Sequence, residues 1–147
     1  MTTIAVKDGV MAADTQLTGD SIHRVPKIFE LPDGGLIGGC GESWSRTYAV
    51  INWFLSGQEG DAPEFEDGCI LILQPDGQIL MAYDRLPAFP IIGATAAIGS
   101  GGPIAMNHMS SGASAEKAVR AACMTEPYSS EPVQVFKLPK RRKKNSS

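Results

Sequence analysis

One stretch near the start of the chain decides the fold: Thr2-Thr3-Ile4-Ala5-Val6-Lys7-Asp8-Gly9-Val10-Met11-Ala12-Ala13-Asp14. Residues 3–7 are rich in strand-forming side chains, and Asp8-Gly9 is a hairpin-turn signal. Residues 10–13 can then return as a second strand. The chain is therefore expected to begin with a pair of antiparallel strands.

Further strand and turn signals follow this hairpin, and helical signals join them. Apolar residues recur at helical spacing over residues 44–55, Ser43 is a suitable N-cap, and Gly57 favours the end of the helix. The acidic stretch 58–67 contains a proline and predicts a loop. The other expected strands are 27–31, 36–37, 69–73, 78–83, 94–98 and 133–138, and the other expected helices are 103–109 and 114–123. This order predicts an α+β fold with two sheets and helices outside them.

Length and composition bound the class of protein. The chain has 147 residues, of which 43% are hydrophobic and 20% charged. That is enough for one compact domain with a core and too short for two ordinary ones. No apolar run approaches the ~20 residues that a membrane span needs, and residues 1–6 lack the features of a signal peptide. We expect a cytoplasmic protein with no membrane partner.

Charge is unevenly distributed, although the net charge is only −3. Five basic residues fall within residues 140–147, so the rest of the chain is more acidic than the total suggests. An acidic body disfavours nucleic-acid binding. The basic end is then either a solubilising segment or a peptide that docks nucleic acid or a partner. We expect one domain over residues 1–138 and a basic, disordered tail over residues 139–147.

Several common catalytic and metal-binding patterns do not occur in the sequence. The three cysteines are widely spaced and form no C-x-x-C pair, which argues against a disulfide framework or a zinc site. No G-x-S-x-G, Walker A or H-E-x-x-H motif is found. The two histidines, His23 and His108, fall in a polar loop and on an expected helix. A catalytic triad with a histidine base is therefore disfavoured.

The α-amine of the chain is another candidate general base. Its ordinary pKa of about 7.7–8.0 suits proton transfer near neutral pH. Met1 precedes a small residue, so its removal would expose Thr2 with the hydroxyl close to a free amine. Taken alone, the Met-Thr-Thr start is a common one and favours an ordinary N-terminus.

Six segments in order resemble the proteasome β-subunit family, and most closely its bacterial HslV-type peptidases, which are N-terminal nucleophile hydrolases. The most specific of them is Ala97-Ile98-Gly99-Ser100-Gly101-Gly102-Pro103. The other five are 2–4, 9–14, 25–31, 36–41, and 126–129 followed by 133–138. The resemblance implies the four-layer αββα sandwich of these hydrolases, with a reduced helical layer, and a threonine peptidase activity.

The resemblance also implies the central catalytic residues. Thr2 would be the nucleophile, its amine would accept the hydroxyl proton, and the Gly41 amide would bind the oxyanion. Lys27 would be the nearby cation, with Asp14 as its counter-charge. Outside the family context, Lys27 and Asp14 would be a surface pair across neighbouring strands, and Gly41 a turn between strand and helix.

Three further residues are implied to hydrogen-bond the amine and nearby waters: Ser100, Glu126 and Ser129. Ser100 is otherwise a helix cap in a glycine turn. Glu126 stands where family members usually carry aspartate, so its charge is moved by one methylene group. A sodium ion held by the carbonyls of Cys123, Glu126 and Ser129 is also implied as a structural ion, and the implied chemistry requires no cofactor.

The chain is shorter than the family pattern, because residues 58–67 leave no room for the second of two long helices. That helix contributes to contacts between subunits, so the stacking of rings and the docking of an HslU-type, ATP-dependent unfoldase stay open. The resemblance still implies a homo-oligomeric ring that acts on peptides or unfolded proteins. Two other functions stay open: an amidohydrolase with the same chemistry on a non-peptide amide, and a catalytically inactive assembly subunit.

Overall fold

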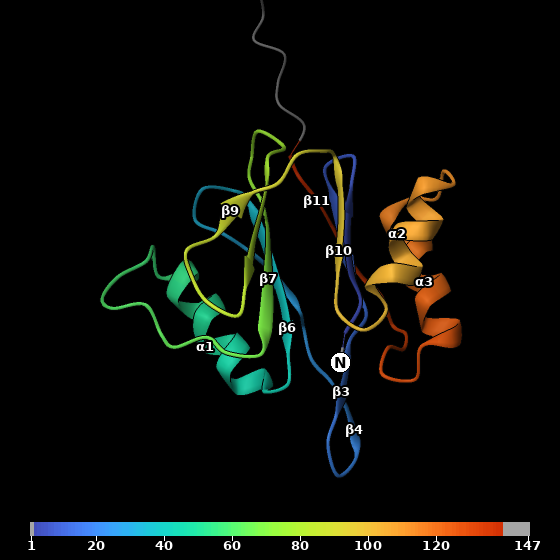
Figure 1. The fold of residues 1–147 in the computed structure, drawn as a ribbon, viewed down its shortest axis with the longest axis horizontal. Helices are drawn as coiled ribbons and strands as arrows, with labels where there is room; N and C mark the ends of the chain where they lie inside the picture. The colour runs from blue at the N-terminus through green and yellow to red at the C-terminus, as the bar shows by residue number, and fades with distance from the viewer. Residues whose placement is uncertain (1, 140–147) are drawn as a thin grey trace, which may run out of the picture.

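Two β-sheets face each other at the centre of the molecule, and helices cover their outer faces (Figure 1). The computed structural model describes residues 2–139, so the expected basic tail lies almost entirely outside the described residues. From one side to the other, the order is α1, a five-stranded sheet, a four-stranded sheet, and the pair α2 and α3. The predicted class, with helices outside two sheets, is confirmed. Within residues 2–139, no helix is long and apolar enough to cross a membrane.

The four-stranded sheet is built around the N-terminal hairpin. Its strands, all antiparallel to their neighbours, are in order β10 (Thr95–Ile98), β1 (Ile4–Lys7), β2 (Val10–Ala13) and β11 (Gln134–Lys137). Asp8 and Gly9 have φ values of 52° and 74°, as a tight two-residue hairpin turn requires. The predicted opening strand pair is therefore confirmed, and it occupies the middle of the sheet.

The second sheet has five antiparallel strands. They are in order β5 (Ile28–Glu30), β6 (Leu36–Gly41), β7 (Gly68–Leu73), β8 (Ile79–Tyr83) and β9 (Phe89–Pro90). A separate two-stranded hairpin joins the sheets, formed by β3 (Gln16–Thr18) and β4 (Ile22–Arg24). This hairpin was not predicted, because its strands are short and mostly exposed and so carry no alternation of apolar and polar residues. His23 therefore lies on a strand and not in a loop.

The helices begin where the sequence predicts. α1 (Trp44–Leu55) is capped by Ser43, whose hydroxyl accepts a hydrogen bond from the Arg46 amide at 3.4 Å. α3 (Ala115–Thr125) is capped by Ser114 in the same way, and α2 (Gly102–Ser110) has a proline in its first turn. Residues 58–67 form neither helix nor strand, so α1 is the one helix in the described chain that covers the five-stranded sheet.

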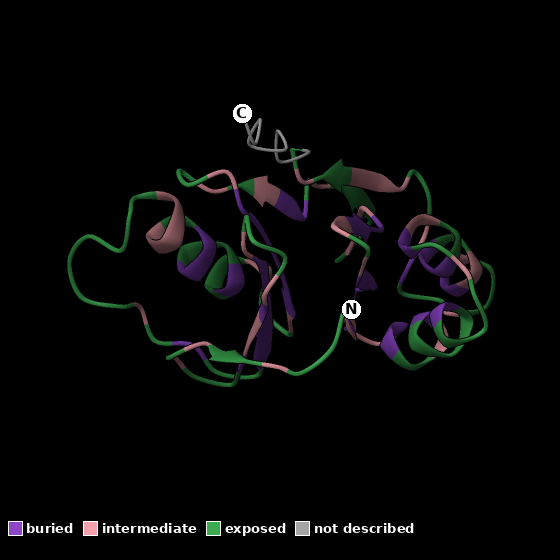
Figure 2. Cartoon of the chain, turned by 90° about the horizontal axis from the view of Figure 1, so that it is seen from above, coloured by how far each residue is buried: buried purple, intermediate pink, exposed green. Residues whose placement is uncertain are grey.

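Three apolar clusters hold these layers together. The largest lies between the two sheets and includes Ile4, Met11, Leu71 and Ile98. The second joins the four-stranded sheet to α2 and α3, and the third joins the five-stranded sheet to α1. Buried residues accordingly concentrate on the strands and on the helix surfaces that face them (Figure 2).

Candidate active site

The topology brings six distant chain segments to one end of the two sheets. Because neighbouring strands are antiparallel, the start of β1, the end of β2, the end of β10 and the start of β11 share one edge of the first sheet. The start of β5 and the end of β6 share the corresponding edge of the second sheet. Thr2, Asp14 and Lys27 lie at these strand ends and come into contact there.

A buried lysine, Lys27, connects Thr2 with Asp14, two of the residues that the resemblance implies are catalytic. Lys27 Nζ donates one hydrogen bond to Thr2 Oγ1 at 2.9 Å and another to Asp14 Oδ1 at 3.0 Å. The side chains of Lys27 and Asp14 are 1% and 0% exposed, and Thr2 is 4% exposed. The alternative of a surface ion pair is therefore wrong. A cation is held in the interior within hydrogen-bond distance of one threonine hydroxyl.

The Asp14 carboxylate is fully hydrogen-bonded. Oδ1 also accepts the Thr3 amide at 2.9 Å. Oδ2 accepts the amides of Gln16 at 3.1 Å and Ser130 at 3.3 Å. Together with Lys27, these donors satisfy both oxygens, as a buried charge requires. The carboxylate therefore fixes both the position of Lys27 and the backbone that carries Thr2.

Burial and charge act on Lys27 in opposite directions. Burial lowers the pKa of Lys27 below the ordinary value, and the adjacent Asp14 carboxylate opposes this effect by charge and hydrogen bonding. A lysine with a lowered pKa is a better proton donor than an exposed lysine. Lys27 can thus stabilise negative charge that develops on the Thr2 oxygen.

The loop after β10 closes the site against the Thr2 backbone. Gly99 has a φ of 92°, and a Cβ atom there would lie 1.8 Å from the Thr2 carbonyl oxygen. A Cβ atom at Gly101 would lie 1.8 Å from Thr3 Oγ1. Only glycine fits this approach. The Ser100 hydroxyl oxygen is buried and has no hydrogen-bond partner among the described residues, which leaves it free for a ligand or for an uncapped amine.

The last loop reaches Thr3 and not the Thr2 hydroxyl. Ser129 Oγ lies 2.7 Å from Thr3 Oγ1 and donates to Glu126 Oε2 at 2.9 Å. Glu126 also accepts the Tyr128 amide at 3.1 Å. Glu126 and Ser129 therefore form a hydrogen-bonded chain that supports the residue next to the nucleophile candidate.

Gly41 lies at the end of β6 and faces the same site. It lines a small cavity of about 90 Å³ together with Thr2 and Lys27. A Cβ atom at Gly41 would lie 2.8 Å from Thr47 Oγ1 and 3.0 Å from the Asp67 carbonyl oxygen. The position is closely packed, so glycine is required there for space.

Three residues of this network were missed by the sequence analysis: Thr3, Gln16 and Ser130. Each contributes a backbone amide to Asp14, and an amide is present at almost every residue, so no side-chain pattern marks it. The one available signal was Ser130, which follows Ser129 directly in the sequence.

The expected sodium site involves the end of α3 and the loop after it. Pro127 has no amide proton, so it cannot donate to the Cys123 carbonyl four residues earlier, and that oxygen keeps its capacity for a ligand. The Glu126 carbonyl accepts the Ser129 amide at 3.2 Å. The oxygen donors suit a hard cation in type. Among residues 2–139, no cluster of three or more His, Cys, Asp or Glu side chains is placed to bind a metal.

Comparisons with known proteins place this geometry in a structural class. No protein-family model matches the sequence, and no curated protein sequence matches it. Solved structures do match over nearly the whole chain. The fold with two facing sheets is shared with solved structures of a BPH and an HslV protein, so the HslV-type fold that the resemblance implied is confirmed.

Three such structures are similar to this chain. BPH from Thiobacillus denitrificans in complex with epoxomicin has a TM-score of 0.68 and 22% identity, covering 95% of this chain and 100% of that one. Another structure of BPH from Thiobacillus denitrificans has a TM-score of 0.65 and 21% identity over the same shares. Eukaryotic HslV from Trypanosoma brucei has a TM-score of 0.63 and 19% identity, covering 93% and 99%. At these identities the likeness establishes the fold alone.

Proposed function

We propose that the protein is a threonine-type endopeptidase, with the αββα architecture of the N-terminal nucleophile hydrolases and with Thr2 as nucleophile after removal of Met1. One observation carries the proposal: Lys27 Nζ bridges Thr2 Oγ1 and Asp14 Oδ1 inside the protein. Burying a lysine and a carboxylate is costly, and an apolar pair would serve stability as well or better. A cation directed at a hydroxyl has a clear use in nucleophilic catalysis.

The reaction follows from the positions of these groups. The Thr2 amine, directly or through a water, accepts the hydroxyl proton while Oγ attacks the peptide carbonyl. Lys27 stabilises the developing alkoxide, and the Gly41 amide donates to the carbonyl oxygen as it becomes negative. The Thr2 amine then gives its proton to the departing amine, leaving an ester on Oγ. Water hydrolyses this ester by the same proton transfers in reverse roles.

The remaining site residues support this arrangement. The Ser100 hydroxyl has no partner and would receive a hydrogen bond from the uncapped amine. Glu126 and Ser129 hold Thr3 in place through the hydrogen-bonded chain described above. These steps require no cofactor, and a sodium ion held by the carbonyls of Cys123, Glu126 and Ser129 would stabilise the last loop.

The proposal extends to assembly and location. An endopeptidase needs to be kept from folded proteins, and a homo-oligomeric ring in the cytoplasm would enclose the active sites. Peptides and unfolded chains would then be the substrates, supplied by an ATP-dependent unfoldase where one is present. Light scattering on the purified chain tests the ring directly: a monomeric mass at micromolar concentration contradicts it.

Mass spectrometry and peptide hydrolysis together test the nucleophile. The intact mass of the purified full chain should lack Met1, and a panel of fluorogenic peptides should be cleaved. Thr2→Ala should abolish cleavage, Thr2→Ser should retain part of it, and Thr125→Ala, at an exposed position on α3, should leave it unchanged. Epoxomicin, present in the BPH complex, should inhibit cleavage by the wild type.

Other outcomes favour the other functions. A fully active Thr2→Ala variant refutes the proposal. A retained Met1 without hydrolysis indicates an inactive assembly subunit, because the amine of Thr2 is then blocked. Cleavage of small amides without any turnover of peptides indicates an amidohydrolase with the same chemistry.

A further inference from the structure

A second cavity adjoins the site at Gly41. Its volume is about 310 Å³, enough for one long side chain, and it shares Gly41 and Glu42 with the small cavity beside Lys27. The second cavity extends to Ser100, on the loop that closes over the Thr2 backbone. The two cavities therefore meet at Gly41, whose amide is the proposed oxyanion donor.

The proposed chemistry indicates which half of the substrate the larger cavity receives. The Thr2 amine must return its proton to the departing amine, so the departing half lies on the backbone side of Thr2. The Gly99–Gly101 loop packs against that side, with the Gly101 amide 3.4 Å from the Thr2 carbonyl oxygen. Because Ser100 lines the larger cavity, this cavity receives the departing half of the peptide.

The charged residues that line this cavity are all acidic. Three acidic residues line it, Glu42, Asp67 and Asp84, and no lysine, arginine or histidine lines it. None of the three forms an ion pair with a described residue. Arg46, in the first turn of α1, is paired with Glu66 at 3.7 Å and so does not neutralise them.

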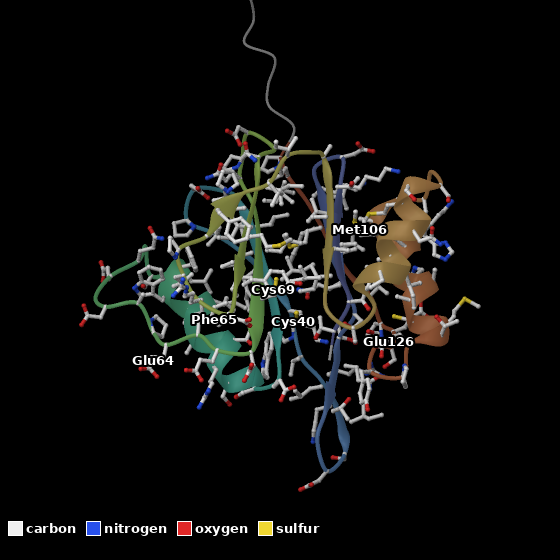
Figure 3. The ribbon with its side chains drawn as sticks, in the orientation of Figure 1. Cys40, Glu64, Phe65, Cys69, Met106 and Glu126 are labelled. Atoms are coloured by element: carbon white, nitrogen blue, oxygen red, sulfur yellow. The ribbon has the colours of Figure 1, made fainter. Side chains whose placement is uncertain are left out.

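The other titratable groups of the cavity are neutral near pH 7. Burial raises the pKa of Cys40 to about 11, and burial also raises the pKa of Cys69. Both cysteines line the cavity and lie between the two sheets (Figure 3). The pKa of Tyr83 is raised as well, first by its interaction with Cys69. The negative charge of the cavity therefore comes from its carboxylates.

We propose that this cavity binds the first residue on the departing side of the scissile bond and selects lysine or arginine there. The inference rests on the proposed peptidase function and deepens it. The three carboxylates attract the cationic end of the side chain. The Ser100 hydroxyl, buried and otherwise without a partner, holds the uncapped Thr2 amine at the edge of this cavity, beside the departing group.

Quenched fluorescent peptides that differ only in the residue after the cleaved bond test this selection. Products are identified by mass spectrometry so that the cleaved bond is known. At low salt, kcat/KM for lysine should exceed that for alanine by about fivefold, since exposed charge pairs contribute little each, and glutamate should be the poorest substrate. The preference should fall as salt is raised. Equal kcat/KM for lysine and alanine at low salt overturns the proposal.

Two variants assign the preference to the cavity. In an Asp67→Asn/Asp84→Asn chain the ratio of lysine to alanine should drop to about twofold or less. Asparagine suits both positions, whose φ values are 52° and 60°, because it tolerates left-handed backbone well. Asp61→Asn removes an exposed carboxylate outside the cavity and should keep the wild-type ratio. A wild-type ratio in the double variant overturns the assignment.

A fluorogenic amide with no amino acid on its departing side separates the two proposals. If the wild type does not cleave this amide or any peptide, the peptidase function fails. If the wild type cleaves the amide and the peptides but does not distinguish lysine from alanine, only the present inference fails.

Discussion

Replacing Asp14 with asparagine tests the charge balance that holds the site together. Asparagine keeps the shape of the side chain but has one acceptor oxygen in place of two. In the wild type, Oδ1 accepts from Lys27 and from the Thr3 amide. Oδ2 accepts the amides of Gln16 and Ser130. Whichever way the asparagine is turned, its NH₂ group faces two donors.

The size of the effect follows from these contacts. Removing one partner of a buried ion pair costs about 3–5 kcal/mol, and each buried donor left without an acceptor costs about 1–3 kcal/mol. These costs overlap, so we expect Asp14→Asn to lower the free energy of unfolding by about 4 kcal/mol. A domain has about 5–15 kcal/mol in total, and the variant should therefore be close to unfolding.

Urea denaturation followed by circular dichroism measures this loss. Asp61→Asn is the matched control, since Asp61 is exposed and forms no ion pair with a described residue; it should change the free energy by less than about 0.5 kcal/mol. The double variant Asp14→Asn/Lys27→Met removes the unpaired cation and should regain about 2 kcal/mol over the single variant. A loss below about 1 kcal/mol in Asp14→Asn, or no recovery in the double variant, refutes the reasoning.

Three further predictions follow from the backbone, from the lysine and from the thiols. Gly99→Ala should lower the free energy of unfolding by over ~2 kcal/mol and reduce peptide cleavage strongly. Gly57→Ala, with a similar φ of 82° and open space around it, should cost only about 1 kcal/mol. If urea melts show that both variants lose the same free energy of unfolding, a steric clash between the added Cβ atom at position 99 and the Thr2 carbonyl is not the cause. Folding lowers the pKa of Lys27, so the charged form of Lys27 destabilises the folded state. This free-energy cost is present in full below the folded pKa and decreases as the pH rises from that pKa towards 10.5. In urea melts at increasing alkaline pH, the free energy of unfolding of the wild type should therefore rise relative to that of Lys27→Met. A fall would show that folding raises the pKa of Lys27. Burial raises the pKa of both Cys40 and the half-buried Cys123 to about 11, so a thiol reagent at pH 7 should label Cys123 slowly and Cys40 only on unfolding, as mass spectrometry of labelled peptides would show.

Much of the fold could be predicted because its elements carry local signals. Ser43 and Ser114 mark the helix starts, and the glycine turns mark the hairpins, since caps and turns depend on side chains close in sequence. The β3–β4 hairpin escaped prediction because its stability comes from contacts with distant residues. Its residue Gln16, for example, donates a side-chain hydrogen bond to the Pro127 carbonyl at 3.2 Å.

The candidate site could be predicted only through the resemblance. Composition and spacing alone left Lys27 and Asp14 as a surface pair, because charge gives no direct indication of burial. The structure adds what no local pattern carries: the amides around the carboxylate, the unpartnered hydroxyl of Ser100, and the acidic cavity beyond Gly41. These features arise from chain segments that meet only after both sheets have formed.

The arrangement of the strands explains why so many of these features share one place. With neighbouring strands antiparallel, each sheet has one end where β1 and β5 begin, and the tight turns 8–9, 32–35 and 75–77 all lie at the opposite end. These turns need few specific side chains beyond glycine and aspartate, so few reactive side chains lie at that end of the sheets. At the site end, the chain starts or leaves the sheets between strands, and three of its free amides converge on the Asp14 carboxylate, which also accepts a hydrogen bond from Lys27. A nucleophile placed at residue 2 therefore meets the network directly, because the first strand begins in the middle of its sheet, with neighbours on both sides.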